Sequence, residues 1–169
     1  MTLAAEVGAG APNFDLASTE GVVIMLRDEV PRSGVVLYLF FGEADERVQK
    51  DLQALEARRD SFASSSSHIL ALSSLKLDDL SALQASLGLG FPLLHDDREF
   101  LSAYGVGEDG AHRALFLVGR DETIRWSTVP VDAVESVIDG LLAELAGLSR
   151  STSNYPKSIL NRFIDRLRG

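Results

Sequence analysis

Few side chains in this sequence could do chemistry, and none of them is a cysteine. The chain has 169 residues, with three His and no Cys. Disulfides, thiolate metal sites, iron–sulfur clusters and thiol nucleophiles are therefore all excluded. The one cluster of metal-ligand residue types is His95-Asp96-Asp97. Adjacent residues of an extended chain point in opposite directions and make a poor chelate, so we expect a solvated turn there and no bound metal.

The other polar residues form no motif for a cofactor or a nucleophile. His68 and His112 have no acid or second histidine at ligand spacing along the sequence, and we interpret both as structural. Ser64 to Ser67 supply hydroxyls without a base. The sequence contains neither a P-loop, nor a glycine fingerprint after a strand, nor a nucleophile elbow. We therefore expect no cofactor.

Charge is distributed unevenly along the chain. Sixteen Lys and Arg stand against 25 Asp and Glu, a formal charge of −9. Residues 150–169 carry a net +4, which leaves −13 on the first 149 residues. The charged residues of this C-terminal segment are Arg150, Lys157, Arg162, Asp165, Arg166 and Arg168. An acidic body disfavours nucleic acid as a partner. No apolar run could cross a bilayer and the N-terminus lacks a secretory signal, so we expect a cytoplasmic location.

Apolar runs and helical repeats alternate through the body of the chain. The run VVLYLFF at 35–41 predicts a strand covered on both faces, and Val48, Leu52, Leu55 and Phe62 then recur near the helical period up to residue 62. The same alternation continues with a strand at HILALSS, a helix carrying Leu80, Leu83 and Leu87, a strand at FPLLHDD, a short helix ending at Gly105, a hairpin across 119–121 and a helix from about 132 to 148. The order βαβαβαββα predicts an α/β sandwich with parallel central strands and a terminal antiparallel pair.

The last twenty residues differ from the body in composition. Residues 149–156, SRSTSNYP, are small, polar and end in Pro, and they predict a linker after a domain at 1–148. Residues 157–169 predict a basic amphipathic helix. The side chains that we expect to contact a partner are Lys157, Ile159, Leu160, Arg162, Phe163, Ile164, Arg166 and Leu167. The alternatives are that this helix packs back on the acidic body or rests on an anionic membrane surface.

Three short motifs point to a known family. Residues 7–16, VGAGAPNFDL, combine a Gly, an Ala-Pro pair, a Phe and a Leu, and residues 87–106 read LGLGFPLLHDDREFLSAYGV. A later strand begins Arg113-Ala-Leu-Phe-Leu-Val. In this order, over roughly residues 7–129, they resemble the peroxiredoxins, the alkyl hydroperoxide reductase and thiol-specific antioxidant family. The resemblance implies a thioredoxin-like, peroxiredoxin-type three-layer sandwich with a central mixed β-sheet, followed here by the C-terminal amphipathic helix.

The family's reactive motif is lost. In the family a Pro, then a Thr and then the peroxide-reducing Cys follow the strand, and an alignment without gaps places these on Phe41, Asp45 and Val48. Only the family's arginine remains, at Arg113. Peroxide reduction needs a thiolate that attacks the O–O bond, and valine has no lone pair. We therefore expect no catalytic residue at Phe41, Asp45, Val48 and Arg113. We expect Arg113 to pair with Asp45, or another acid of that turn, and to fill the old pocket with Phe41 and Val48.

These patterns lead to one preferred interpretation of function and two alternatives. The preferred one is a non-catalytic accessory or assembly subunit of a protein complex, anchored through the basic C-terminal helix. The complex could be membrane-associated, and a homodimer is compatible with the sequence. The first alternative is an enzyme of unrelated chemistry in the former pocket, with Asp45 as acid or base beside Arg113. The second is residual antioxidant activity by another route.

Overall fold

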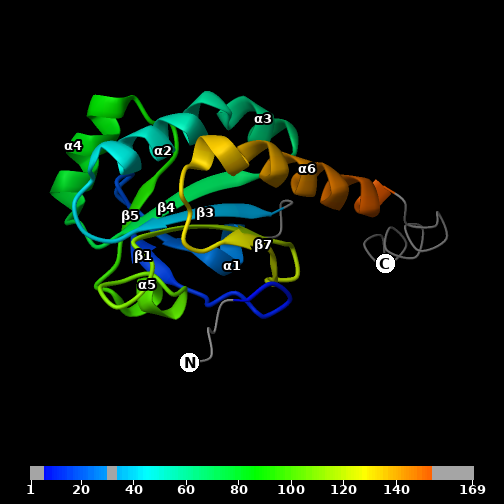
Figure 1. Ribbon diagram of the computed structural model, residues 1–169, viewed down its shortest axis with the longest axis horizontal. Coiled ribbons are helices and arrows are strands. Elements are labelled where there is room, and N and C mark those ends of the chain that lie inside the picture. The colour runs from blue at the N-terminus through cyan, green and yellow to red at the C-terminus, as the bar shows by residue number, and fades with distance from the viewer. Residues whose placement is uncertain (1–5, 30–33, 154–169) are drawn as a thin grey trace.

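The computed structural model describes residues 6–29 and 34–153, in which strands and helices alternate as expected. The elements are β1 (Asp15–Ala17), β2 (Val23–Met25), α1 (Leu26–Glu29), β3 (Val35–Phe40), α2 (Glu46–Ala57), α3 (Arg59–Ser64), β4 (His68–Ser73), α4 (Leu77–Leu87), β5 (Leu93–His95), α5 (Glu99–Ala103), β6 (Arg113–Val118), β7 (Ile124–Thr128) and α6 (Val134–Ser153). A five-stranded sheet in the order β5-β4-β3-β6-β7 lies in the middle, and β1 and β2 form a separate hairpin (Figure 1).

Strand β3 is the central strand of the sheet, and all six of its residues are buried. It pairs in parallel with β4 and antiparallel with β6, while β5 and β7 extend the sheet on either side. Parallel strands need long crossovers, which α2 with α3 and then α4 supply. The register sets Phe40, the last residue of β3, opposite Arg113, the first residue of β6. The sheet therefore brings Arg113 to the point where β3 leads into α2.

Two apolar cores lie on the two faces of the sheet, because successive strand residues point to opposite sides. Tyr38 and Phe40 belong to the core under α2, α3, α4 and α6. Leu37 and Leu39 belong to the core covered by β1, β2, α1 and α5. Figure 1 shows these layers above and below the sheet. Among the described residues, both cores are built from positions 11–148.

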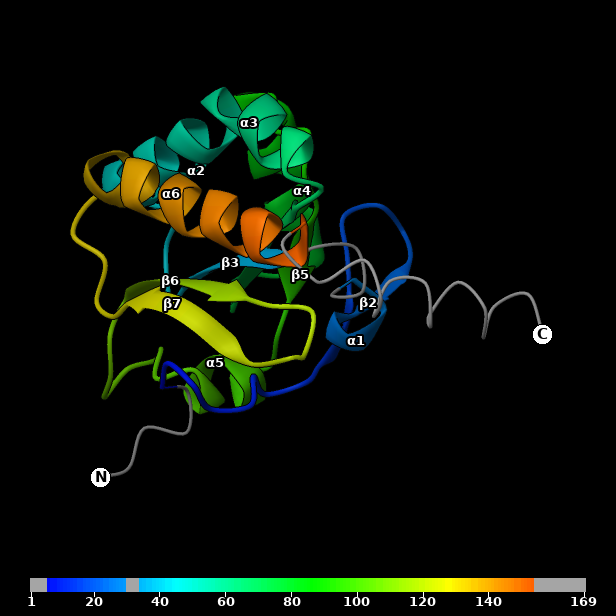
Figure 2. The same ribbon diagram turned by 90° about the vertical axis from the view of Figure 1, so that its right-hand side faces the viewer.

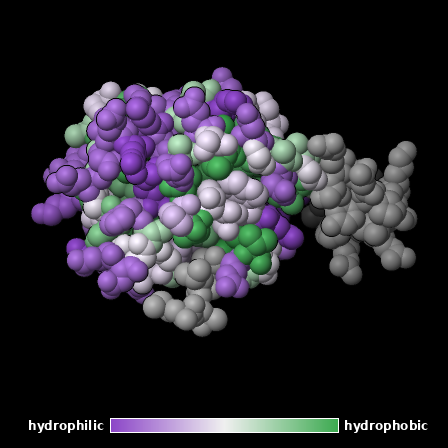
Figure 3. Space-filling view, viewed as in Figure 1, coloured by the Kyte–Doolittle hydropathy of each residue, from purple (hydrophilic) through white to green (hydrophobic). Residues whose placement is uncertain are grey.

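The helical layer differs from the expectation in one place. The sequence predicted one continuous helix up to residue 62, but the chain forms α2 and then α3, with Arg58 at φ −107 between them. No Gly or Pro marks this break in the sequence. Figure 3 shows hydrophilic side chains gathered over α2 and α4, as expected for helices that bury only one face. The predicted stop of α4 is present, with Gly88 in the left-handed conformation at φ 66.

Helix α6 is longer than the sequence suggested. It continues to Ser153, through the first five residues of the predicted linker. The rest of that linker and the predicted basic helix at 157–169 lie outside the described residues. Within residues 6–29 and 34–153, no helix combines the length and the apolar composition that crossing a membrane requires.

Candidate functional site

A hollow of about 600 Å³ opens where β3 leads into α2 and where β6 begins. It is lined by Phe41, Gly42, Glu43, Asp45, Arg47, Val48, His112, Arg113, Pro130, Val131 and Asp132. All four positions that the sequence singled out, Phe41, Asp45, Val48 and Arg113, therefore surround one space. The expectation that an Asp45–Arg113 pair fills this space is wrong, because the hollow is open.

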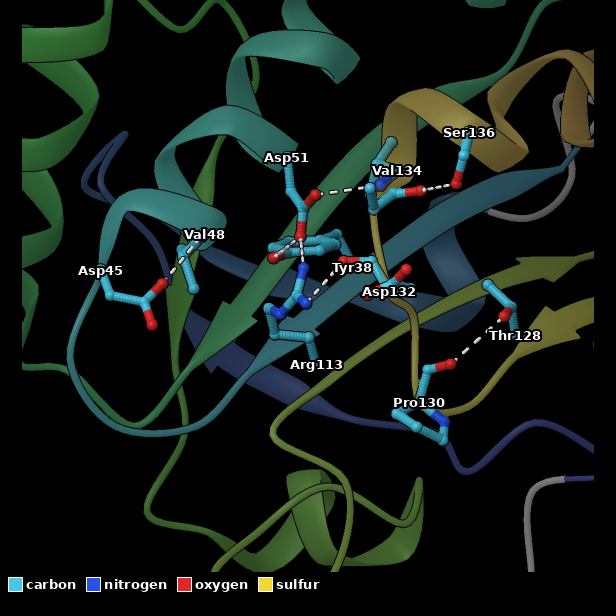
Figure 4. A network of polar contacts seen from close by, with 11 residues as sticks. Tyr38, Asp45, Val48, Asp51, Arg113, Thr128, Pro130, Asp132, Val134 and Ser136 are labelled. Carbon is cyan, nitrogen blue, oxygen red and sulfur yellow. Dashed lines mark hydrogen bonds and ion pairs between the residues drawn. The ribbon is translucent and has the colours of Figure 1, made fainter.

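Asp45 starts helix α2. Its backbone is extended, at φ −71 and ψ −177, and its carboxylate Oδ1 accepts a hydrogen bond from the Val48 amide at 3.0 Å. This satisfies one of the free N–H groups of the first turn. A carboxylate is also favoured there by the positive end of the helix dipole. Asp45 is thus the N-cap of α2, with its carboxylate directed to the Val48 amide (Figure 4).

Arg113 pairs with Asp51 instead. Nη1 of Arg113 donates to Oδ2 of Asp51, and Nη2 donates to the Asp132 carbonyl at 2.6 Å. Asp51 lies on the inner face of α2 with Val48, Leu52 and Leu55, and only 3% of its surface is exposed. The ion pair predicted with Asp45 is wrong because Asp45 precedes the helix, whereas Asp51 is carried inward over the start of β6.

The Asp51 carboxylate holds three further elements together (Figure 4). Oδ2 also accepts the Tyr38 hydroxyl of β3 at 2.7 Å, and Oδ1 accepts the Val134 amide at the first residue of α6 at 2.9 Å. Through these bonds α2 is tied to β3, β6 and the start of α6. No buried side-chain nitrogen or oxygen in the described ranges lacks a hydrogen-bond partner. Because every member is satisfied, the network rigidifies one wall of the hollow.

This network fixes protonation states on both sides of Asp51. Burial raises the pKa of Tyr38, and the negative charge of Asp51 raises it further, so the phenol stays neutral. Burial alone would lower the pKa of Arg113, but its hydrogen bond and ion pair with Asp51 outweigh that effect and raise it. Arg113 therefore stays charged, and Asp51 compensates its charge.

The floor of the hollow is apolar where the family would place its reactive residue. Val48 lies in the first turn of α2 and is 3% exposed. Its side chain offers neither a nucleophile nor a hydrogen-bonding atom. The first turn of a helix would suit a thiolate, but this chain has no Cys at any position. The arrangement can bind a ligand or a partner surface, but it cannot run a thiol cycle.

Phe41 lies between two polar groups at the mouth of the hollow. Its ring centroid lies 6.4 Å from that of His112 and 5.2 Å from the guanidinium carbon of Arg98, a cation–π distance. Arg98 has φ 83, a left-handed backbone that is uncommon outside glycine. Arg98 could not be predicted from the sequence because it lies 57 positions from Phe41, and no short-range pattern links the two.

The other candidate residues lie apart from this hollow. Asp96 is buried and accepts the Leu101 amide at 2.8 Å, whereas the Asp97 side chain is 94% exposed and its Oδ1 lies 2.9 Å from His95 Nε2. The expected solvated turn is therefore wrong for Asp96, which is buried by its bond to the start of α5, and holds for the exposed Asp97. In the described ranges no three His, Cys, Asp or Glu side chains form a group that could hold a metal ion. His68 pairs with Glu29 at 3.0 Å, a partner that sequence spacing did not suggest.

The partner-contacting residues proposed at 157–167 all lie outside the described ranges. They are Lys157, Ile159, Leu160, Arg162, Phe163, Ile164, Arg166 and Leu167.

The fold and the hollow together define a class of protein. A mixed sheet with β3 central, β4 parallel and β6 antiparallel to it, and a hollow at the start of α2, is the thioredoxin-like fold of the peroxiredoxin type. The peroxidoxin BcpB of Mycobacterium tuberculosis superposes with a TM-score of 0.77 at 18% identity, over 85% of this chain and 97% of that one. Peroxiredoxin Q of Xanthomonas campestris gives 0.74 at 20% identity, over 86% and 97%. The reduced Plasmodium vivax 2-Cys peroxiredoxin gives 0.76 at 18% identity, over 91% and 86%.

The sequence itself identifies the family. The profile of the AhpC/TSA family matches residues 7–127. The chain belongs to the AhpC/TSA family, and the fold predicted from its motifs is confirmed. It is a Cys-less member. A search of the curated proteins found no match to the chain.

Proposed function

We propose that this chain is a non-catalytic member of its family and works as an accessory or assembly subunit of a cytoplasmic protein complex. The observation that carries the proposal is the position of Val48. It occupies the first turn of α2 on the floor of an open hollow, in a chain without Cys. A fold retained without its reactive group has binding as its remaining use.

The charged groups support the same proposal. Arg113 is held by Asp51 and by the Asp132 carbonyl, so it is not free to polarise a bound substrate. Asp45 uses one carboxylate oxygen to cap α2. Neither side chain is placed as an acid or base with a free nucleophile beside it. The fold is maintained by these groups, and this accounts for their presence without a reaction.

The anchor is the basic segment after Ser153. Residues 154–169 carry Lys157, Arg162, Arg166 and Arg168 against Asp165, while five apolar residues recur at helical spacing between 159 and 167. A basic amphipathic helix of this kind binds by laying its apolar face in a groove of a partner. A membrane-associated complex is a setting in which its positive charge would also contact anionic lipid.

The test is affinity purification of the tagged chain from its native source, followed by mass spectrometry. We expect the full chain to retain a defined set of proteins, and a chain ending at Ser153 to lose them. The double variant Arg162→Glu/Arg166→Glu should lose them too. The matched control, Lys50→Glu/Arg27→Glu, makes the same change at exposed positions of the body and should retain them. If the truncated chain keeps every co-purifying protein, the anchor proposal is wrong.

One observation favours a second candidate, an enzyme of unrelated chemistry. The hollow is open and large enough for a small molecule, and Glu43, Asp45 and Asp132 are exposed at its edge. A thermal-shift screen of small metabolites tests this candidate. A compound that raises the melting temperature of the wild type, but not that of Asp132→Lys, would favour it. A screen without such a compound would count against it.

A further inference from the structure

We infer that the C-terminal segment 154–169 rests in a second hollow of its own domain until a partner displaces it. This inference rests on the proposed docking role of the segment and adds where the segment is held before it docks. The hollow measures about 380 Å³ and lies at the start of β4, the end of the sheet opposite Val48. It is lined by Glu20, Ile24, Glu29, Arg59, Ala63, Ser67, His68, Ile69, Leu70, Gly90, Phe91 and Pro92.

The end of α6 lies at this same end of the molecule. The Gly34 Cα lies under Leu145 of α6, since a Cβ on Gly34 would be 3.9 Å from the Leu145 side chain. The Gly34 carbonyl accepts the His68 amide at 3.4 Å, and His68 in turn pairs with Glu29. A short chain of contacts thus links Leu145, about two turns before the end of α6, to the lining of the second hollow. Figure 2 looks onto this end and shows β2 and α1 there.

Chain length decides which hollow the segment can reach. A helix over 157–167 is roughly 16 Å long, and three extended residues add roughly 10 Å. The former peroxide hollow lies beside Asp132, at the beginning of α6, and the 20 residues of α6 span roughly 30 Å from there to Ser153. A helical segment that starts after Ser153 is therefore too short to reach that hollow. The second hollow lies at the end of the molecule where α6 ends.

The chemistry of the second hollow suits a basic amphipathic helix. Its lining includes the apolar side chains of Ile24, Ile69 and Phe91. It also includes two carboxylates, Glu20 and Glu29, of which Glu29 pairs with His68 at 3.0 Å. Arg59 does not oppose a basic ligand, because it pairs with Glu56 at 3.1 Å and lies flat on Gly90, where a Cβ would be 2.3 Å from its guanidinium.

The hairpin next to this hollow exposes apolar surface. Among the described residues only three large hydrophobic side chains are strongly exposed, and two of them, Val22 and Val23, at 56% and 63%, lie in the β1–β2 hairpin that also supplies Glu20 and Ile24. The third, Val7, is 60% exposed and lies near β7, the opposite edge strand of the five-stranded sheet, where the Gly8 amide donates to the Ile124 carbonyl. An apolar helix face covering Val22 and Val23 would bury this surface.

Tethering favours this segment over one from a second copy. A short flexible connection gives an effective concentration in the millimolar range, so a dissociation constant of about 1 mM suffices for half occupancy within one chain. The same affinity between separate copies at micromolar concentration leaves the hollow almost empty. A segment that is docked this weakly is also readily displaced from the hollow by a partner that binds it more tightly.

The absence of Cys makes the experiment direct. Asn161→Cys, a polar position within the segment, supplies the single thiol of the chain for a nitroxide label. In the full-length protein we expect the label to broaden the backbone amide signals of Glu20, Ile24 and Ser67 to a loss of most of their intensity, and to spare Glu43 and Arg47 at the former peroxide hollow. Unchanged intensities at Glu20, Ile24 and Ser67 would overturn the inference.

Two controls separate the explanations. Val23→Glu should abolish the broadening and raise the amount of partner captured, while Val7→Glu, equally exposed, should change neither. A second control mixes two chains, one with the nitroxide but no NMR isotope and one with the isotope but no nitroxide. This mixture should show no broadening. Broadening in that mixture would assign the hollow to a second copy and overturn the intramolecular contact. Unchanged amide intensities, together with partners that are lost when the segment is removed, would contradict this inference alone. Broadened amide signals, together with partners that remain when the segment is removed, would contradict the proposed function alone.

Discussion

Val48 and Asp51, three residues apart on one helix, account for most of what this site can and cannot do. Val48 leaves the start of α2 without a reactive atom, and Asp51 forms an ion pair with the arginine that lines the hollow. Val48 supplies no nucleophile, and Asp51 compensates the charge of a buried cation. At the scale of single residues the site is therefore organised for stability.

Restoring a thiol at position 48 alone should not restore a peroxidase. In Val48→Cys the sulfur would stand beside the Asp45 carboxylate, which is bonded to the amide of the same residue at 3.0 Å. A nearby anion disfavours the thiolate, and both terminal nitrogens of Arg113 already donate to other groups. We expect the variant to react with hydrogen peroxide no faster than free cysteine in a stopped-flow assay. Val48→Cys/Asp45→Thr, which removes the anion, should react faster. Fast turnover by the single variant would contradict this account of Asp45.

Removing the charge of Asp51 should destabilise the whole fold. Asp51→Asn leaves Arg113 as a buried cation without its counter-ion, and breaking one partner of a buried pair costs about 3–5 kcal/mol. Urea denaturation should show this loss in the free energy of unfolding. Asp60→Asn, an exposed acid at the start of α3, is the matched control and should lose less than about 0.5 kcal/mol. Equal, small losses in both variants would mean that the buried pair does not form.

At the scale of elements, Asp45 matters as the N-cap of α2. Asp45→Ala should lower the free energy of unfolding by about 1 kcal/mol, because the Val48 amide loses its acceptor. Asp45→Asn keeps an acceptor oxygen and should cost only about a few tenths of that. Both losses are measured from the shift of the urea midpoint, with the slope of the unfolding free energy against urea concentration unchanged. A loss in Asp45→Asn as large as that in Asp51→Asn would instead assign Asp45 to the ion pair with Arg113.

The order of elements could be predicted because it is carried by strong apolar patterns. The run at 35–41 is short and rich in β-branched and aromatic residues, which favours a strand buried on both faces, and β3 covers Val35–Phe40. The breaks that the sequence did not predict lack such a pattern. Arg58 separates α2 from α3 without Gly or Pro, and Ser149–Ser153 continue α6 despite a composition typical of linkers. Tertiary packing and helix propagation decide these boundaries.

The candidate site was only half predictable for a related reason. Sequence alignment to the motif located Phe41, Asp45, Val48 and Arg113, and all four line one hollow. It did not identify the partner of Arg113, because Asp51 looks in sequence like a surface acid. One signal was present: Asp51 falls between Val48, Leu52 and Leu55, on the apolar face of α2. An acid inside an apolar stripe indicates a buried counter-ion.

At the scale of the whole molecule, the two cores each bury one tyrosine that must stay protonated. Burial raises the pKa of Tyr38, assisted by the charge of Asp51, and burial raises the pKa of Tyr104. An unfolded tyrosine ionises near pH 10, so above that pH the unfolded chain releases protons that the folded chain keeps. Stability is therefore full below pH 10 and falls as the pH rises, by about 1.4 kcal/mol per pH unit for each tyrosine.

Urea unfolding between pH 9 and pH 11 measures this loss. Tyr104→Phe should roughly halve the slope above pH 10, since its hydroxyl bonds only to the Pro12 carbonyl and one of the two buried phenols is removed. An unfolding free energy that stays constant from pH 9 to pH 11 would contradict the burial of both side chains.

The whole molecule combines an acidic folded body with a basic segment after Ser153, and we propose that the segment binds a partner and that the body catalyses no reaction. The measurement that tests this most directly is consumption of peroxide by the purified full chain with a dithiol reductant. The alkyl-peroxide-reducing bacterioferritin comigratory protein of Xanthomonas campestris serves as the positive control. We predict a rate equal to that of buffer with reductant alone. Turnover above that background, proportional to the concentration of the chain, would contradict the account.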